Sequence, residues 1–321
     1  MKLNKNKWLW VLSLALLAGC KEDTDISEFS SYAKVYMPQA YNKPAVHDFI
    51  MSENEEEIIY GAGLGTPGDN GNDVEVKFKV DPAKVQAFNE ENFTSYPMMP
   101  EGSYRLEQTS TVIKKGTTTS PVLKLKVKTL DNFDGVGYYI LPVSIDQVSG
   151  GISVNENLRT TYFLVRAQYE SNPFQMYDRS KWTVANFSSD ENENASGGRA
   201  AHAIDGSNTT FWTTQWRNAK PGPPHHITLN MGETKKIHGI KFRARTDASG
   251  NIRTGNHPKD VIIETSVDGT NWTYSESFSL INELESTMYL SYAQDARYFR
   301  VTVNSAHNDT YNTNIAEIYA F

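Results

Sequence analysis

Short segments in which apolar and polar residues alternate one by one most constrain the fold of this chain. Residues 74–80 (VEVKFKV) and 123–128 (LKLKVK) alternate without a break. Because successive side chains of a β-strand point to opposite faces, each segment would bury one face and leave the other in water. Such strands are typical of antiparallel sandwiches. Similar segments run over residues 138–145, 161–166, 237–242, 261–265 and 298–303, and together they predict an all-β fold.

Helical spacing is confined to residues 82–89, where Val85 and Phe88 share a face and Pro82 lies in the first turn. No helical segments alternate regularly with the strands, which argues against a Rossmann sheet or a TIM barrel. The 321 residues exceed what one core usually serves, so we expect two domains. A polar stretch ending in proline follows the strand at 161–166. We therefore place one domain at residues 35–167, a linker at 168–177 and a second domain at 178–321.

The first twenty residues predict export and a lipid anchor. Three lysines precede an apolar run, residues 8–17, that is too short to span a bilayer comfortably. The run ends in Leu17-Ala18-Gly19-Cys20, which resembles the lipobox of bacterial lipoproteins. Cys20 is the only cysteine of the chain, so it has no disulfide partner within it. We expect a signal peptide at residues 1–20 and lipidation of Cys20; an ordinary secretory signal is the alternative.

The start of the mature chain indicates where the anchor would lie. Cys20 is followed by Lys21 and then by Glu22 and Asp23. This order resembles the export signal of Bacteroidota lipoproteins, and the resemblance implies an outer-membrane location facing the cell exterior. The inner leaflet of that membrane is the alternative. Residues 21–34 are acidic and serine-rich, which predicts a flexible linker.

Charge and motif content exclude two classes of function. The chain has 31 Lys+Arg and 38 Asp+Glu, a net charge of −7, and no basic stretch suited to a phosphate-tracking groove. Nucleic acid is therefore not an expected partner. The sequence contains no G-x-S-x-G or H-E-x-x-H motif. It also lacks an evident pair of carboxylates on strand ends, which glycosidic cleavage would need. We predict that the protein is not an enzyme.

A series of short motifs characterises the first domain. They are Val35-Tyr36-Met37-Pro38, Val85-Gln86-Ala87-Phe88-Asn89, Tyr96-Pro97-Met98-Met99-Pro100, Ile113-Lys114-Lys115-Gly116 and Tyr139-Ile140-Leu141-Pro142-Val143. In this order they resemble the domain of unknown function that opens many Bacteroidota surface lipoproteins and some endo-β-N-acetylglucosaminidases. The resemblance implies an immunoglobulin-like sandwich with no assigned chemistry. Residues 61–65 (GAGLG) lack the Lys-Ser/Thr of a phosphate-binding loop, and we expect a mobile hairpin there.

A second series of motifs runs through the C-terminal half. It includes Ala203-Ile204-Asp205-Gly206, Phe211-Trp212, Ser266-Val267-Asp268-Gly269-Thr270-Asn271-Trp272 and Ala296-Arg297-Tyr298-Phe299-Arg300-Val301. These motifs resemble the discoidin, or coagulation factor 5/8 C-terminal, superfamily, whose sugar-binding branch is the family 32 carbohydrate-binding modules. The resemblance implies a galactose-binding-like jelly-roll sandwich that binds ligands with the loops at one end. We expect Trp182, Trp212 and Trp272 in its core.

The same resemblance indicates a sugar site made of Trp216, Arg245 and Asn251, with Thr213 beside them. Sugar recognition needs an exposed aromatic ring for the apolar face of a pyranose and fixed polar groups for its hydroxyls. Galactose-binding members carry a histidine, which commonly reads an axial hydroxyl, where this chain has Thr213. Packing at the rim is the alternative role for Trp216, and a surface ion pair is the alternative for Arg245.

A structural calcium ion is also implied. Asp205, Thr210 and Glu317 match positions that hold calcium in family members, and a hard cation needs several oxygens at once. The alternative is an Asx-turn at Asp205-Gly206 without a metal.

We predict a non-catalytic, cell-surface, glycan-binding lipoprotein. It would capture a polysaccharide or host glycan for a polysaccharide-utilisation system, with an outer-membrane import porin complex as a further partner. The alternative is a surface adhesin or structural partner whose discoidin domain binds protein or membrane. Membrane-binding discoidin domains typically expose apolar loop tips, and this sequence shows no such cluster beside Trp216.

Overall fold

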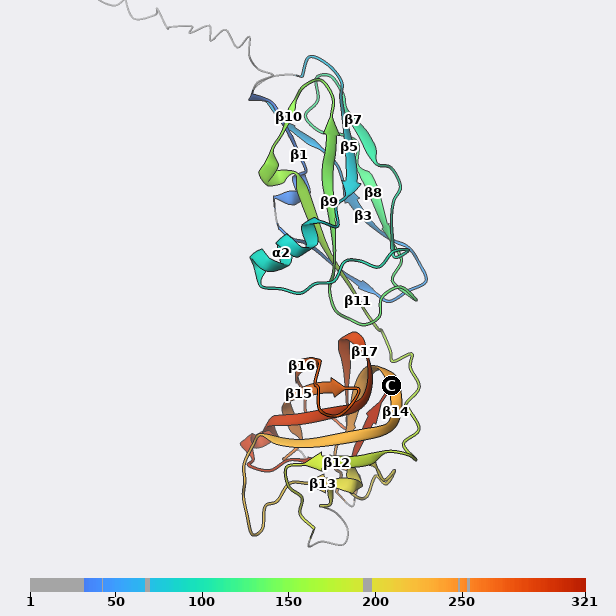
Figure 1. Ribbon diagram of the computed structural model, residues 1–321, viewed down its shortest axis with the longest axis vertical. Coiled ribbons are helices and arrows are strands. Elements are labelled where there is room, and N and C mark those ends of the chain that lie inside the picture. The colour runs from blue at the N-terminus through green and yellow to red at the C-terminus, as the bar shows by residue number, and fades with distance from the viewer. Residues whose placement is uncertain (1–31, 42, 67–69, 193–197, 248, 253–254) are drawn as a thin grey trace, which may run out of the picture.

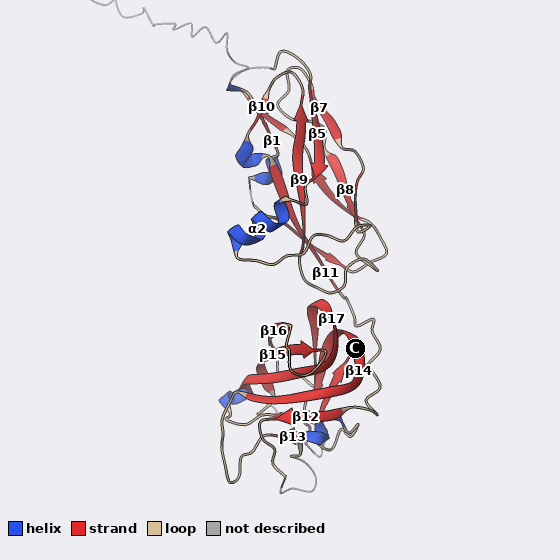
Figure 2. Cartoon of the chain, viewed as in Figure 1, coloured by secondary structure: helices blue, strands red, loops and turns tan. Residues whose placement is uncertain are grey.

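A computed structural model of the chain describes residues 32–321 except 42, 67–69, 193–197, 248 and 253–254. Cys20, the predicted signal peptide and most of the predicted linker lie outside the described residues. Two β-sandwiches follow one another along the chain (Figure 1), and strands dominate both of them (Figure 2), so the expected all-β fold is confirmed. Within those ranges, no helix combines the length and the apolarity needed to cross a membrane.

The N-terminal domain is an immunoglobulin-like sandwich whose sheets share one core. Its largest sheet has the order β2-β11-β9-β5-β7, formed by β2 (Ala45–Ile50), β11 (Thr160–Gln168), β9 (Tyr139–Val148), β5 (Val74–Val80) and β7 (Ser110–Ile113). Two three-stranded sheets complete it: β10 (Ser153–Val154), β1 (Lys34–Tyr36) and β4 (Gly63–Gly65), and β3 (Glu56–Tyr60), β8 (Leu123–Val127) and β6 (Tyr104–Leu106).

Alternation along the strands explains which side chains enter this core. In β5 the apolar residues Val74, Val76 and Phe78 are buried, whereas the charged residues between them are exposed. In β8 the buried positions again alternate with lysines. Removing each apolar side chain from water stabilises the sandwich by about 1.5–3 kcal/mol, which selects the register that turns these residues inward.

The α-helix α2 (Lys84–Asn92) begins two residues later and ends three residues later than the predicted helix. Phe88 on its inner face packs against Ile140 and Leu164 of the large sheet. The helix ends at Phe93, which adopts a left-handed backbone conformation with φ of 54°. Two 3-10 helices, η1 (Pro38–Ala40) and η2 (Glu156–Leu158), connect strands of the same domain.

The expectation of a mobile hairpin at residues 61–65 was wrong. Residues Gly63–Gly65 form β4, which pairs with β1, and Gly63 is buried. A Cβ atom on Gly63 would lie 2.6 Å from the ring of Tyr36. Glycine is needed here because an aromatic ring packs directly on its backbone, a contact that residue types alone do not reveal.

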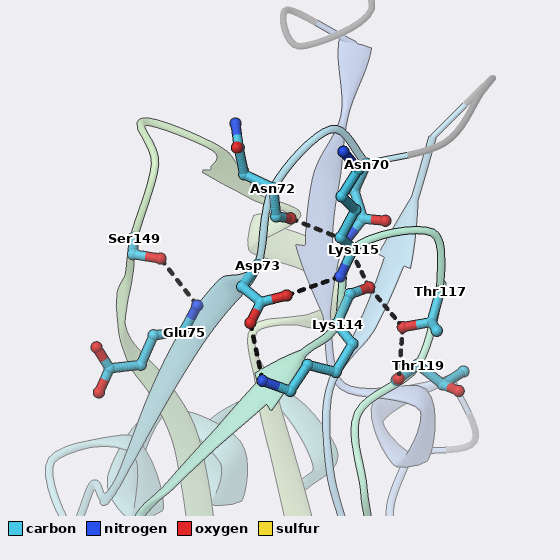
Figure 3. A network of polar contacts seen from close by, with 9 residues as sticks. All are labelled: Asn70, Asn72, Asp73, Glu75, Lys114, Lys115, Thr117, Thr119 and Ser149. Atoms are coloured by element: carbon cyan, nitrogen blue, oxygen red, sulfur yellow. Dashed lines mark hydrogen bonds and ion pairs between the residues drawn. The ribbon is translucent and has the colours of Figure 1, made fainter.

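A polar network fastens the turn after β7 to the segment that precedes β5 (Figure 3). The buried carboxamide of Asn70 donates a hydrogen bond to the carbonyl of Lys114 (3.0 Å) and accepts one from the backbone of Gly116 (2.7 Å). The carboxylate of Asp73 contacts the Lys114 ammonium (2.8 Å) and the Lys115 backbone N–H (2.9 Å). These side chains therefore hold the end of the sandwich together.

Two long strands, β14 (His225–Arg243) and β17 (Glu285–Ala306), form the frame of the C-terminal jelly-roll sandwich. They pair antiparallel and are interrupted by register shifts between Asn230 and Lys235 and between Ile237 and Gly239. The same sheet contains β12 (Thr183–Phe187), β15 (Pro258–Ser266), β16 (Tyr274–Ser279) and β19 (Glu317–Ala320). A separate pair consists of β13 (Trp212–Thr213) and β18 (Asn314–Ile315), and the 3-10 helices are η3 (Ala200–Ile204) and η4 (His307–Asp309).

The tryptophans expected in the second core divide into two groups. Trp182 and Trp212 are buried in it, as predicted. Trp272 is only half-buried, and the Arg300 guanidinium lies 4.4 Å from the centre of its ring. The expectation for Trp272 was wrong because this residue follows a hairpin turn and packs on the outside of the sheet, where a cation covers it.

The two domains meet at residues 290–293 of β17, which we call the junction bulge. Here β14 contributes one residue, His238, opposite four residues of β17. The backbone N–H groups of Val136 and Gly137 donate hydrogen bonds to the carbonyls of Leu290 (3.3 Å) and Ser291 (2.7 Å). A Cβ atom on Gly137 would lie 2.7 Å from the Ser291 carbonyl oxygen, so this approach requires glycine.

Side chains reinforce the junction. Tyr292 of the bulge donates a hydrogen bond to the Tyr138 carbonyl, and its ring packs edge-on against Tyr139 with centroids 5.5 Å apart. The Lys236 ammonium lies 3.0 Å from the Asp134 carboxylate. Backbone pairing, ring packing and an ion pair therefore hold the sandwiches in one mutual orientation.

Candidate functional site

A cavity of about 240 Å³ opens among the loops of the C-terminal sandwich, beside β13. In Figure 1 β13 marks the end of this domain that faces away from the N-terminal domain. The bends of β14 and β17 lie at the junction, whereas the ends of these strands lead into the loops around the cavity. We call it the tip cavity. Its residues come from five separate stretches of the chain.

Two aromatic side chains line the tip cavity, and much of the surface of each is exposed to water. Trp216 is 39% exposed and Tyr311 is 40% exposed. The Arg217 guanidinium lies 5.0 Å from the centre of the Trp216 ring, and the Lys220 ammonium lies 5.1 Å from that of Tyr311. Each ring is thus contacted by a cation and still presents apolar surface, an arrangement that suits stacking with a ligand.

Arg245 lines the same cavity, just beyond the end of β14. Its guanidinium lies 3.7 Å from the centre of the buried Phe211 ring. This contact holds the planar group in place, and a fixed guanidinium can donate paired hydrogen bonds. The structure therefore brings the predicted residues Trp216 and Arg245 to one cavity.

A buried carboxylate supports the loop that carries Trp216. Glu191 is 3% exposed, and its Oε2 accepts hydrogen bonds from the backbone N–H groups of Trp216 (3.3 Å) and Arg217 (3.2 Å). Glu191 lines the cavity, although we did not select it from the sequence. It lies in an acidic, polar stretch, and nothing local distinguishes it from the neighbouring acidic residues.

Thr213, the position of the family histidine, also lines the cavity but is 5% exposed. Its hydroxyl donates to the carbonyl of Thr313 (3.1 Å) and accepts from the Asn312 amide (3.4 Å). Asn314 beside it is 3% exposed, and its Oδ1 has no hydrogen-bond partner among the described residues. The floor therefore contains one engaged hydroxyl and one amide oxygen able to accept a hydrogen bond.

Asn251 does not reach this group. Its side-chain amide donates to the Asp247 carboxylate (3.3 Å), and its backbone N–H donates to the same side chain (2.9 Å). Asn256 lines the cavity instead and donates to Asn312 Oδ1 (2.7 Å). Asn251 is hydrogen-bonded to Asp247 within its own turn. The amide that Asn251 was predicted to contribute to the sugar site is therefore contributed by Asn256. Its position two residues before β15 is the signal that could have found it.

Two histidines support the segment that carries Asn256. The rings of His257 and His307 are nearly parallel, at 7°, with centroids 6.2 Å apart. His257 is fully buried, and burial, together with the nearby His307, lowers its pKa to about 4. The His307 backbone N–H donates to the His257 carbonyl (2.8 Å). His257, which follows Asn256 directly in the chain, therefore stays neutral near neutral pH.

The predicted calcium positions also lie together. The Thr210 hydroxyl and the Ser207 backbone N–H donate to the Asp205 carboxylate, which forms the Asx-turn. Glu317 is fully buried and pairs with Arg179, and its Oε1 has no hydrogen-bond partner in the described part of the chain.

The electrostatics at Glu317 fit a cation. Burial raises the pKa of Glu317; the Arg179 guanidinium opposes this, and the Asp205 charge adds to it. Two mutually repelling carboxylates and an orphaned oxygen are a suitable donor set, although Arg179 already supplies one positive charge. No cluster of three or more histidine, cysteine or acidic side chains exists among the described residues, so backbone oxygens would have to complete the shell.

Family models match parts of both halves of the chain. A family model of the F5/8 type C domain matches residues 184–318, and a model described as a "-like, N-terminal domain" matches residues 29–152. The sialidase of Micromonospora viridifaciens is 31% identical over 145 residues, which are 44% of this chain and 22% of the sialidase. The chain spans about a fifth of the length of the curated relatives it matches.

Solved structures resemble the C-terminal half. The C-terminal domain of a chitobiase from Bacteroides fragilis is 28% identical, covers 46% of this chain and 97% of that chain, and superposes with a TM-score of 0.39. The family 32 module of NanJ from Clostridium perfringens, solved with galactose, is 22% identical over 45% of this chain and 96% of that chain, with a TM-score of 0.37. Residues 184–318 thus match the F5/8 type C domain, and we refer to the C-terminal sandwich as the discoidin domain.

Proposed function

We propose that this protein is a non-catalytic glycan-binding protein and that the tip cavity holds one sugar residue of a polysaccharide or host glycan. One observation carries the proposal: Trp216 and Tyr311, each about two-fifths exposed, flank a cavity whose floor is polar. Apolar ring surface combined with a few fixed polar groups is the usual composition of a site for small hydroxylated ligands.

The polar groups assign distinct roles. The Arg245 guanidinium donates to ring or hydroxyl oxygens, and Asn314 Oδ1 accepts from a hydroxyl. Asn256 supplies a carboxamide on the opposite wall.

The Thr213 hydroxyl is already engaged in two hydrogen bonds, so it contributes little to the choice of sugar. Members with a galactose site carry a histidine at this position. We therefore expect that this site does not strictly require the axial hydroxyl of galactose. The asparagine amides would instead determine which sugar is bound most tightly. The sialidase and galactose oxidase among the curated relatives act on carbohydrates, as their names state, which supports a sugar as the ligand class.

The cellular role follows from the N-terminus. A lipid on Cys20 would anchor the chain to the outer membrane, and the N-terminal sandwich would hold the discoidin domain away from that surface. From there the tip cavity would present glycans to an outer-membrane import porin complex of a polysaccharide-utilisation system. Calcium at Asp205, Thr210 and Glu317 would have a structural role, tying the loop after η3 to β19.

A glycan array tests the proposal. We expect the mature chain to bind a defined subset of glycans, with a dissociation constant of about 0.1–1 mM for one site. Trp216→Ala should abolish the signal because it removes the larger stacking ring, and Tyr311→Ala should weaken binding about tenfold, or about 1.4 kcal/mol.

Phe187→Ala is the matched control, since Phe187 is 41% exposed and lies on β12 outside the cavity. Its binding should equal that of the wild type. A blank array with folded protein, or binding that survives Trp216→Ala unchanged, would overturn the glycan assignment. A protein or membrane surface would then be the ligand of an adhesin.

A further inference from the structure

We propose that the chain has a second ligand site, for a neutral saccharide of one or two sugar units, in the cavity between its two domains. This cavity, the junction cavity, has a volume of about 560 Å³ and is lined by residues of both sandwiches and of the segment that joins them. Ligand sites commonly have volumes of about 300–1,000 Å³ and occur preferentially between domains. The proposal does not depend on the function of the tip cavity.

The junction cavity is preformed because its walls belong to the junction described above. Asp134 lines it and pairs at 3.0 Å with Lys236, which lines it from the other domain. The adjoining residues 136 and 137 are hydrogen-bonded to the junction bulge. A ligand would thus enter a cavity whose two halves are already held together, without paying to order them.

Aromatic side chains form one wall. The Phe174 ring is stacked on His238 with centroids 4.0 Å apart at 13°. Tyr169 stands edge-on to Phe174 at 82°, with centroids 5.3 Å apart. Both are half-buried, so each keeps part of its surface open to the cavity that it lines. Such surface suits the apolar face of a pyranose ring.

Polar groups line the remainder of the cavity. Asp131 and Asn132 contribute side-chain acceptors from the N-terminal domain. His238 contributes an imidazole whose buried Nδ1 has no hydrogen-bond partner among the described residues. Burial lowers the pKa of His238, which keeps the ring neutral near neutral pH.

The charges select against anions. Asp131 and Asp134 contribute two carboxylates, and the one lysine of the lining is already paired with Asp134. A phosphate or a uronate would meet net repulsion, whereas hydroxyl groups would find acceptors in both carboxylates and in the Asn132 amide. Aromatic surface together with several hydroxyl acceptors therefore points to a neutral sugar.

The test is residue-resolved NMR of the mature chain, titrated separately with galactose, N-acetylglucosamine, mannose and xylobiose to about 10 mM, where millimolar sites fill. At least one sugar should shift the backbone amides of Asn132 and Lys236. These shifts should persist in Trp216→Ala, which disables only the tip cavity. They should disappear in His238→Phe, which keeps a ring against Phe174 but removes both ring nitrogens.

His226→Phe is the control on the same strand, because His226 lies outside the junction cavity, and it should retain the shifts. Asn132→Leu provides a second blocking variant if His238→Phe does not fold. The proposal is overturned if no sugar shifts the backbone amide signals of residues 132 and 236, which is the result expected when only water occupies the cavity. It is also overturned if these shifts persist in both blocking variants. Shifts confined to the tip residues would also overturn it while leaving the tip site intact. Shifts confined to the junction would support it and count against the proposed function.

Discussion

The two ends of the discoidin domain are built on the same two strands but are completed in different ways. At the junction end, β14 and β17 bend, the bulge at residues 290–293 is paired with another backbone, and aromatic rings pack on each other. At the tip end, the strands lead into loops, two rings are partly exposed to water, and a buried amide oxygen has no hydrogen-bond partner within the described part of the chain.

The difference shows how one frame can hold a rigid connection and a recognition surface at once. Bends in long strands expose backbone groups in a fixed geometry, which suits pairing with a second sheet. Loops at strand ends expose side chains of many types, which suits selective contact with a ligand. Three changes test whether the two ends behave this differently.

The largest effect is expected at the junction. Gly137→Val places a side chain where a Cβ atom would already lie 2.7 Å from the Ser291 carbonyl. We expect the junction to open at a cost above about 3 kcal/mol, so that calorimetry resolves two separate melting transitions and X-ray scattering shows a broader distribution of shapes. Glycan binding at the tip should be unchanged.

Gly71→Val provides the control, because a Cβ atom at Gly71 meets nothing within 4 Å and the residue lies in the same domain. It should leave melting and scattering unaltered. If Gly137→Val melts in a single unshifted transition, the junction does not hold the domains together.

Lowering the pH should reduce the free energy of unfolding through His257, which lies near the tip cavity. Burial lowers the pKa of His257 from the ordinary 6.5 to about 4, so the unfolded chain takes up this proton first as pH falls. The stabilisation, about 3 kcal/mol, is therefore complete above pH 6.5 and is lost as the pH falls toward 4. Urea unfolding at about pH 7 and pH 4.5 measures it. His257→Gln should lose clearly less stability than the wild type between these values; equal losses in both proteins would contradict the assignment.

A smaller effect is expected from calcium. Calcium at about a hundredfold excess over its dissociation constant should stabilise the discoidin domain by about 2.7 kcal/mol and raise its melting temperature by several degrees. Glu317→Gln should remove this response by deleting the buried carboxylate, whereas Glu283→Gln should preserve it. If the melting temperature is the same with calcium and with a chelator, the calcium site is excluded, and Asp205 only forms an Asx-turn.

The fold class was predictable because alternation is a local property. The strand predicted at residues 74–80 coincides with β5, and the one at 123–128 differs from β8 by one residue. The bends of β14 and β17 were not predictable, because each depends on a register shift against the partner strand rather than on its own sequence. Trp272 likewise carries a core residue type but lies on an outer surface.

The candidate site was predictable only in part. Trp216 and Arg245 were found because they accompany motifs of the family. Glu191 and Tyr311 were missed, because they reach the cavity from loops 120 residues apart along the chain, and only the folded sandwich brings them together. Asn251 was predicted and Asn256 was not considered, because spacing alone cannot show which asparagine is already used in a turn.

The parallel pairing of β2 with β11 has a mechanical consequence. Tension between the N-terminal end of the chain and the discoidin domain is met first by β1, which pairs with β4 and β10. Once β1 detaches, the tension enters at the start of β2 and leaves at the end of β11, since Ala45 pairs with Phe163 and Ile50 with Gln168. Pulling two parallel strands from opposite ends strains all their mutual hydrogen bonds together instead of unzipping them one after another. This pairing would therefore resist tension applied between the two ends of the N-terminal sandwich.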